Sequence, residues 1–143
     1  MRLSVTVLNN QIPARMTRVK KAAQQGLSIA VGIGANTFVD AAKTLVPVDT
    51  GNLQDHIHAE VIEDTPQRQV RAVTPAFAAS NKYGFDPAYA RRIEYGFHGT
   101  DSLGRQYDQG PQPYMRPAFD EHQSEVSDQI KATVRGFIPE RLS

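Results

Sequence analysis

The sequence predicts an α+β protein, in which a small, mainly antiparallel sheet packs against a long N-terminal helix, a short helix and a C-terminal helix. Apolar residues recur every three or four positions across residues 12–45 and 118–136, a spacing typical of helices with one buried face. Apolar and polar residues alternate across 2–8 and 54–63, a pattern typical of strands. The octet 46–53, which contains a proline, an aspartate and a glycine, separates the long helix from the strand that follows.

Length and composition narrow the protein class. A chain of 143 residues is expected to form one domain spanning residues 1–143. The absence of cysteine excludes a disulfide framework and a thiolate metal site, and the net charge of +1 gives no reason to expect DNA wrapping or membrane adsorption. No apolar run approaches the roughly 20 residues that span a bilayer. We therefore expect a soluble, intracellular protein that needs no cofactor.

The N-terminal third is predicted to be a strand, Arg2–Leu8, followed by one long helix, Ile12–Leu45. Three glycines at 26, 32 and 34 each cost about 1 kcal/mol of helix propensity, so a kink or break is expected near Val31–Gly34. Unbroken, the helix would be about 50 Å long. Either a neighbouring subunit covers its overhang, or the helix bends around its own sheet. Arg15, Arg18, Lys20 and Lys21 are expected to form a solvated basic face rather than a phosphate site.

The octet is predicted to turn the helix into a new strand. Pro47 bars the preceding residue from the helical conformation and ends the helix. Asp49 and Thr50 can accept hydrogen bonds from the amides just ahead, and Gly51 permits a positive φ.

After the octet, the sequence predicts a strand over 54–63, a hairpin partner over 67–73 that Pro75 ends, and a loop over 76–81. A short helix is predicted over Pro87–Tyr95, with Gly96 terminating it. Residues 97–112 lack periodicity and predict a long loop, which leads to a last helix opened by Pro117.

Two patterns in the sequence are compatible with catalysis or metal binding. Asp49-Thr50-Gly51 matches the triplet of dimeric aspartic proteases, in which two carboxylates share a proton in a dry floor between strands. Here a helix precedes the triplet, so a structural turn is the preferred interpretation. His56 and His58, with His98 or His122, could form a three-histidine metal site, but such spacing is common on wet strand faces and we predict no metal.

Three segments together resemble the small tail-completion, or head–tail joining, proteins of long-tailed bacteriophages, often labelled minor tail components. The first has the form apolar-Pro-Val-Asp-Thr-Gly-x-Leu, the second Tyr-Ala-x-x-apolar-Glu-aromatic-Gly, and the third Pro-x-Pro-aromatic-apolar-Arg-Pro-Ala. In this chain they are Ala41–Leu53, Tyr89–Gly96 and Pro111–Ala118.

The resemblance implies a structural virion protein without catalysis, assembled in the bacterial host cytoplasm and located at the head–tail junction. It implies a ring of six subunits that contacts the head-closure or connector protein and the tail tube protein, with genomic DNA passing through its centre in transient, non-specific contact. A head-closure or connector adaptor and a tail terminator of the same neck are the alternatives.

The resemblance also implies roles for particular residues. The residues of the three segments are expected to have structural roles: some shape the turn, and Tyr89, Ile93 and Tyr95 pack the short helix. Glu94 is expected to pair with an arginine such as Arg116, and the residues of the third segment to fix the start of the last helix. The residues with these structural roles are Pro47, Asp49, Thr50, Gly51, Leu53, Tyr89, Ile93, Glu94, Tyr95, Gly96, Pro113, Tyr114, Arg116 and Pro117. The residues expected to contact the neighbouring ring lie in the loop: Phe97, His98, Asp101, Leu103, Arg105 and Tyr107.

Overall fold

The computed structural model describes residues 12–75 and 87–138 and has the predicted α+β architecture. The predicted strand at Arg2–Leu8 and the predicted loop at 76–81 lie outside the described residues. The elements in chain order are α1 (Ile12–Leu45), α2 (Asn52–His56), β1 (Ile57–Asp64), β2 (Gln69–Pro75), α3 (Pro87–Tyr95), β3 (Phe97–Thr100), β4 (Gln106–Gln109) and α4 (Met115–Phe137).

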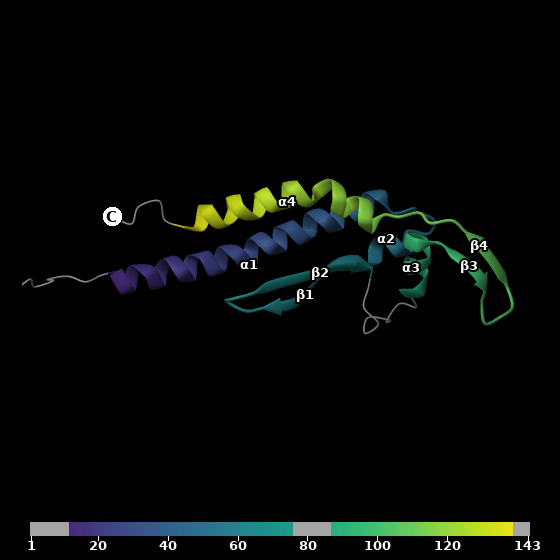
Figure 1. Ribbon diagram of the computed structural model, residues 1–143, viewed down its shortest axis with the longest axis horizontal. Helices are drawn as coiled ribbons and strands as arrows, with labels where there is room; N and C mark the ends of the chain where they lie inside the picture. The colour runs from purple at the N-terminus through teal and green to yellow at the C-terminus, as the bar shows by residue number, and fades with distance from the viewer. Residues whose placement is uncertain (1–11, 76–86, 139–143) are drawn as a thin grey trace, which may run out of the picture.

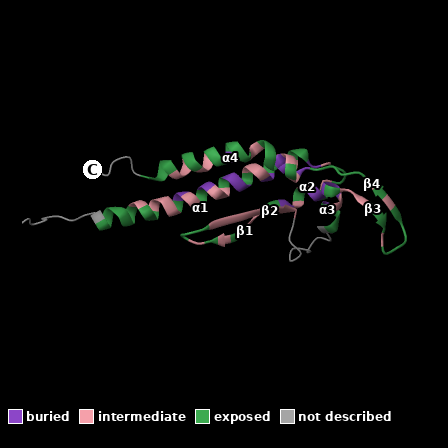
Figure 2. Cartoon of the chain, in the orientation of Figure 1, coloured by how far each residue is buried: buried purple, intermediate pink, exposed green. Residues whose placement is uncertain are grey.

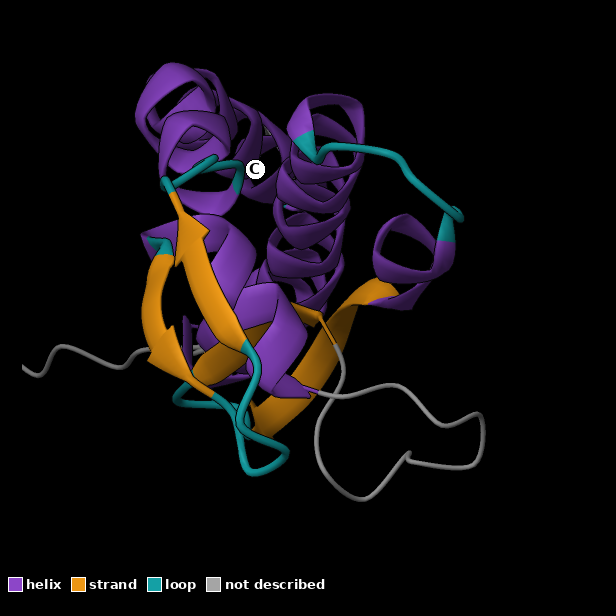
Figure 3. Ribbon diagram, turned by 90° about the vertical axis from the view of Figure 1, so that its right-hand side faces the viewer, coloured by secondary structure: helices purple, strands orange, loops and turns teal. Residues whose placement is uncertain are grey.

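The described part of the chain is elongated. Helices α1 and α4 run antiparallel side by side, the β1–β2 hairpin lies along another side of α1, and the β3–β4 hairpin projects at the far end beyond α3 (Figure 1). Figure 3 shows the same arrangement from the end of the molecule, with the paired helices above the strands. The predicted sheet is therefore two separate antiparallel hairpins within the described residues.

Helix α1 is continuous from Ile12 to Leu45, so it is not broken near Val31–Gly34. Gly26 and Gly34 instead let α4 approach closely. A β-carbon on Gly34 would lie 2.7 Å from Cγ1 of Val126, and one on Gly26 would lie 2.9 Å from Cβ of Phe137. Packing against α4 offsets the poor helix propensity of these two glycines.

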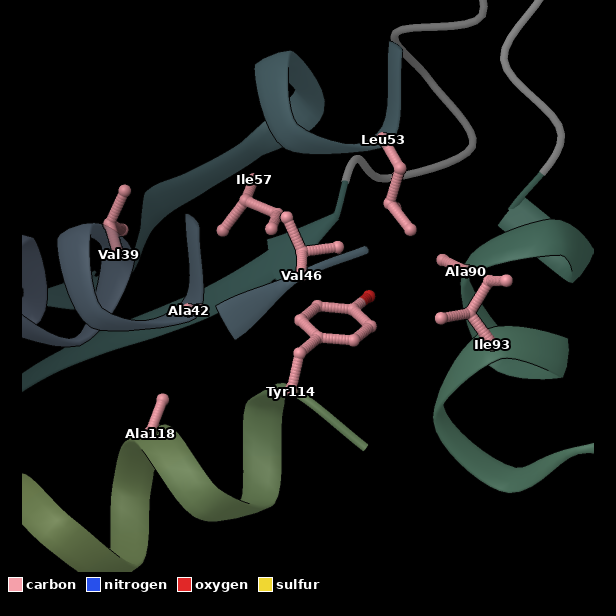
Figure 4. Packing of buried hydrophobic residues seen from close by; sticks show 9 residues of the cluster. All are labelled: Val39, Ala42, Val46, Leu53, Ile57, Ala90, Ile93, Tyr114 and Ala118. Carbon is pink, nitrogen blue, oxygen red and sulfur yellow. The ribbon is translucent and has the colours of Figure 1, made fainter. Parts of the chain in front are cut away.

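The main core lies at one end of the helical pair, where α1, α2, β1, α3 and the first turn of α4 meet (Figure 2). Figure 4 shows the ring of Tyr114 between Val46, which follows α1, and the α3 side chains Ala90 and Ile93. The buried cluster comprises Val39, Ala42, Val46, Leu53, Ile57, Ala90, Ile93, Tyr114 and Ala118. A small core shared by five elements leaves much of both long helices on the surface.

Several predicted boundaries shift. The strand expected over 54–63 begins only at Ile57, because Asn52–His56 form helix α2 and place Leu53 in the core. Its partner is Gln69–Pro75 rather than 67–73, in a register that is interrupted between Val61 and Glu63. Helix α4 begins at Met115, before Pro117, a position where the first helical turn tolerates proline.

The glycine contacts predict opposite effects for two alanine substitutions in α1. Gly34→Ala should lower the free energy of unfolding by about 1–2 kcal/mol, because the methyl group pushes α4 away by more than the propensity gain returns. Gly32→Ala is the matched control. A β-carbon there meets nothing within 4 Å, so this change should raise stability by about 0.5–1 kcal/mol. Urea denaturation of both variants measures the effects, and equal stabilisation of both would contradict the close approach.

Candidate assembly surfaces

The octet 46–53 forms a turn, as predicted, although it leads into α2 and not directly into a strand. Of the two side chains expected to bond its amides, one does so. Val46 and Leu53 are buried on either side of the turn, and Gly51 has φ of 80°. The hydroxyl of Thr50 accepts a hydrogen bond from the amide of Asn52 at 3.4 Å. The Asp49 carboxylate is exposed and forms no hydrogen bond within the described residues, so the prediction that it caps amides is wrong.

Asp49 also lacks the surroundings that an aspartic protease requires. It lies on an exposed turn between α1 and α2, beside the half-buried Pro47, and not on a loop between buried strands. An exposed carboxylate on a turn is well solvated, which does not provide the dry, paired arrangement needed to share a proton.

The Glu94 side chain connects α3 to the start of α4. Its buried carboxylate accepts hydrogen bonds from the backbone amides of Tyr114 at 2.8 Å, Met115 at 3.0 Å and Arg116 at 3.1 Å. These amides belong to the first turn of α4, which has no partner for them within the helix and carries a partial positive charge. Glu94 is therefore the N-terminal cap of α4, supplied from another helix.

This arrangement corrects the expected pairing of Glu94 with Arg116. The carboxylate binds the backbone amide of Arg116, while the exposed guanidinium lies 4.0 Å from Asp120. A carboxylate buried with three donors is well satisfied, so it needs no guanidinium partner.

The cap positions Tyr114, the residue before α4. The ring is 1% exposed, and burial raises the pKa of Tyr114 to about 12, with the Glu94 charge adding to the effect. Pro113 before it is exposed and Pro117 after it is half-buried. The phenol is therefore neutral and acts as an apolar core group with a polar tip.

Helix α3 turns a different face to the core than expected. Ile93 is buried as predicted, but Tyr89 and Tyr95 are exposed, Tyr95 by 73%, and Ala90 fills the core position beside Ile93. Gly96 ends the helix with φ of 76°. A β-carbon there would lie 2.8 Å from the Gln109 carbonyl, so glycine is required both for the turn and for the strand that crosses it.

Residues 97–112, predicted to be a long loop, contain the β3–β4 hairpin. Phe97 pairs with Gln109 and Thr100 with Gln106. The Asp101 carboxylate holds the connection: it accepts hydrogen bonds from the amides of Leu103 and Arg105 at 2.9 and 3.0 Å, from Nε of Arg105 at 2.7 Å and from the Tyr107 hydroxyl at 3.1 Å. The hairpin tip is thus ordered by one side chain.

The predicted contact residues divide into two groups on this hairpin. Phe97 and Tyr107 pack with ring centroids 5.8 Å apart, and the Arg92 guanidinium of α3 lies 4.4 Å from the Phe97 centroid. His98 is exposed and its Nδ1 lies 2.6 Å from Asp108. Leu103 is 75% exposed at the tip. Phe97 and Tyr107 therefore fix the hairpin on α3, whereas Leu103 exposes an apolar side chain to solvent at the hairpin tip.

The sequence holds a signal for this hairpin that the strand pattern alone did not reveal. Residues 101–104 read Asp-Ser-Leu-Gly, with aspartate at the first and glycine at the fourth position of a turn. The amide of Gly104 donates to the Asp101 carbonyl at 3.0 Å, and Gly104 has φ of 81°. The flanking strands are only four residues long, too short for periodicity to identify them.

A second apolar surface lies between the long helices and β2. A groove of about 260 Å³ is lined by Phe38, Arg71, Val73, Met115 and Phe119, among others. The Phe38 and Phe119 rings stack across it with centroids 5.2 Å apart, yet Phe119 remains largely exposed. Exposed apolar area of this kind is typical of a protein with partners.

The histidines do not converge. His56 ends α2 and His58 lies in β1, so the two are not on one strand face, and each ring bonds a nearby backbone carbonyl. No group of three or more His, Asp or Glu side chains among the described residues could hold a metal ion. The described helices also include none that is long and apolar enough to cross a membrane.

Comparison with known proteins identifies one family. The chain matches the HK97-gp10-like family, described as "Bacteriophage HK97-gp10, putative tail-component", over residues 10–96. This range covers α1 to α3 and ends at the glycine that terminates α3. No curated protein and no solved structure gives a significant match.

Removing the charge of Glu94 should destabilise the protein. Glu94→Gln replaces one acceptor oxygen by an amide group facing the donors of α4, and should cost about 1–3 kcal/mol of unfolding free energy. Glu121→Gln, on the exposed side of α4, is the control and should change stability by less than about 0.5 kcal/mol. Comparable losses in both variants would argue against the cap.

The order of the hairpin tip should depend on pH through Asp101. Hydrogen bonds from four donors lower the pKa of Asp101 to about 2, although burial acts in the opposite direction. The Arg105 amide contributes most, followed by the Arg105 guanidinium, the Leu103 amide and the Tyr107 hydroxyl. Because this pKa is below the ordinary 3.8, the interaction is complete above about pH 4 and is lost as the pH falls through 2.

NMR signals of the Leu103 and Arg105 amides should report this loss, with a midpoint near pH 2. Asp101→Asn should abolish the transition, whereas Asp108→Asn should leave it in place. A midpoint near 3.8 in the unmodified protein would show that the hydrogen bonds do not hold the carboxylate in its charged form.

Proposed function

The chain belongs to the HK97-gp10-like family of bacteriophage tail components, and from this premise we propose that it is a structural protein of the phage neck. It forms a ring of six subunits that completes the tail and joins it to the head-closure or connector ring, with DNA passing through the centre. The family match is the observation that carries this proposal.

The shape of the molecule supports assembly. Gly26 faces Phe137, the last residue of α4, so residues 12–25 of α1 extend past the end of α4. Most of residues 13–25 are exposed. Met16 in this overhang is 68% exposed. A small core with long, uncovered helices gains stability when neighbouring subunits cover them.

The β3–β4 hairpin is the proposed contact with the neighbouring ring. Its tip presents Leu103, and the Asp101 hydrogen bonds hold that tip in one conformation before binding. A preordered apolar tip loses little conformational entropy on docking. The hairpin lies outside the region matched by the family, as befits a surface adapted to one particular partner.

Two other neck proteins, a connector adaptor and a tail terminator, would use the same ring and the same surfaces. We propose no catalytic role, because Asp49 is on an exposed turn.

The proposed partners are genomic DNA in the centre of the ring and the tail tube protein on the face opposite the head-closure ring. The net charge of +1 suits weak, sliding contact with DNA and not tight binding.

Electron microscopy of particles assembled without this protein tests the proposal. We expect unjoined heads and tails, restored to complete virions by the unmodified protein and equally by the Asp49→Asn variant, because Asp49 has no chemical role. Complete virions in the absence of the protein would refute the structural role, and failure of Asp49→Asn alone would favour the protease. Rings of the purified protein in negative stain would support the assembly.

A further inference from the structure

The overhang of α1 is uniformly basic. Arg15, Arg18, Lys20 and Lys21 are all exposed, and α1 contains no acidic residue before Asp40. Arg18 and Lys21 form no ion pair within the described residues. Spaced three apart, Arg15, Arg18 and Lys21 follow one another along neighbouring turns of the helix and present a positive stripe.

Helix α4 carries an acidic stripe of matching length. Glu121, Glu125 and Asp128 are exposed and stand at positions i, i+4 and i+7, so they share one side of the helix. Among the described residues they have only weak, exposed partners: Glu125 accepts a hydrogen bond from Gln129 at 3.1 Å, and Asp128 lies 3.2 Å from Lys131. The stripe is about 10 Å long and the basic stripe about 9 Å, at about 1.5 Å per residue.

The two stripes cannot meet within one subunit. Val126, between Glu125 and Asp128, faces Gly34 of α1, thirteen residues from Lys21. Thirteen helical residues span about 20 Å. At physiological salt, charges at that separation are screened over a length of about 8 Å. Attraction between the stripes therefore requires a second copy of the chain.

We propose that the basic overhang of α1, residues 12–25, docks on the Glu121–Glu125–Asp128 stripe of α4 in the neighbouring subunit. The two contact surfaces are different, so each subunit uses both, and the contact repeats head to tail. Such a contact closes into a ring when its rotation permits.

This inference rests on the proposed ring and names the interface that holds it together. The competing partner for a basic helix is the DNA phosphate backbone. The neighbouring subunit is favoured because the chain itself carries an acidic counterpart of the same length, and because the net charge of +1 is small for a DNA-binding surface.

Charge reversal tests the interface. The α1 variant combines Arg18→Glu with Lys21→Glu, and the α4 variant combines Glu121→Lys with Glu125→Lys. Each alone places like charges together at every contact, and should weaken ring assembly by about 100-fold or more. A 1:1 mixture of the two should assemble again, because each overhang then meets a stripe of opposite charge. Light scattering and negative-stain microscopy give the size of the particles.

The mixture also controls for folding, since two misfolded variants would not form a ring. The matched control for the α1 variant combines Arg68→Glu with Arg91→Glu, at exposed positions of the β1–β2 turn and α3. It changes the net charge by the same amount as the α1 variant and should leave assembly intact. Rings of the unmodified protein should weaken between 50 and 500 mM salt, in keeping with an ionic contact.

Each other outcome has a definite meaning. If the unmodified protein forms rings and the reversed variants form them equally well, this interface is refuted and the proposed ring stands. If the α1 variant assembles but loses affinity for a 30-base-pair duplex, the overhang contacts DNA and the inference is refuted. If the unmodified protein forms no ring, the proposed assembly fails and this interface fails with it.

Discussion

The fold depends on one buried carboxylate. Glu94 places a negative charge in the interior of the protein, which would be costly without partners, and three amides at the start of α4 satisfy it. The interaction fixes α3 against α4 and places Tyr114 among the side chains of α1 and α3. Segments that are distant in the sequence thereby share one core, although no sheet connects them within the described residues.

The close α1–α4 contact is the second constraint, and it gives the molecule its shape. Gly26 and Gly34 remove the side chains that would hold the two helices apart, so the pair packs over a long, narrow interface. A narrow interface buries little of each helix, and charged and apolar side chains remain on the outside. For a phage tail component this distribution is useful, since the uncovered surfaces can be completed by neighbouring subunits.

The hairpin at the far end follows a different principle. Asp101 satisfies four donors and fixes a short connection that strand propensity alone would not hold, and Arg92 stacks the hairpin on α3. An apolar tip held in this way is suited to recognition, because its conformation does not have to be selected at the moment of contact. In the assembly proposed above, subunits pack along the helices, and contact with other proteins is made by the hairpin tip.

Sequence patterns correctly predicted the α+β class, the long helix that Pro47 ends, the short helix that Gly96 ends, and the family, because periodicity, proline and glycine act locally. The roles of individual side chains emerged only from the three-dimensional packing. Two of the glycines expected to break α1 let α4 approach, and Glu94 binds backbone amides instead of a guanidinium. In the turn, the Thr50 hydroxyl accepts an amide hydrogen bond, whereas the Asp49 carboxylate accepts none within the described residues. The physical reason is that these roles depend on which group lies opposite in space, and that neighbour is set by packing rather than by sequence spacing.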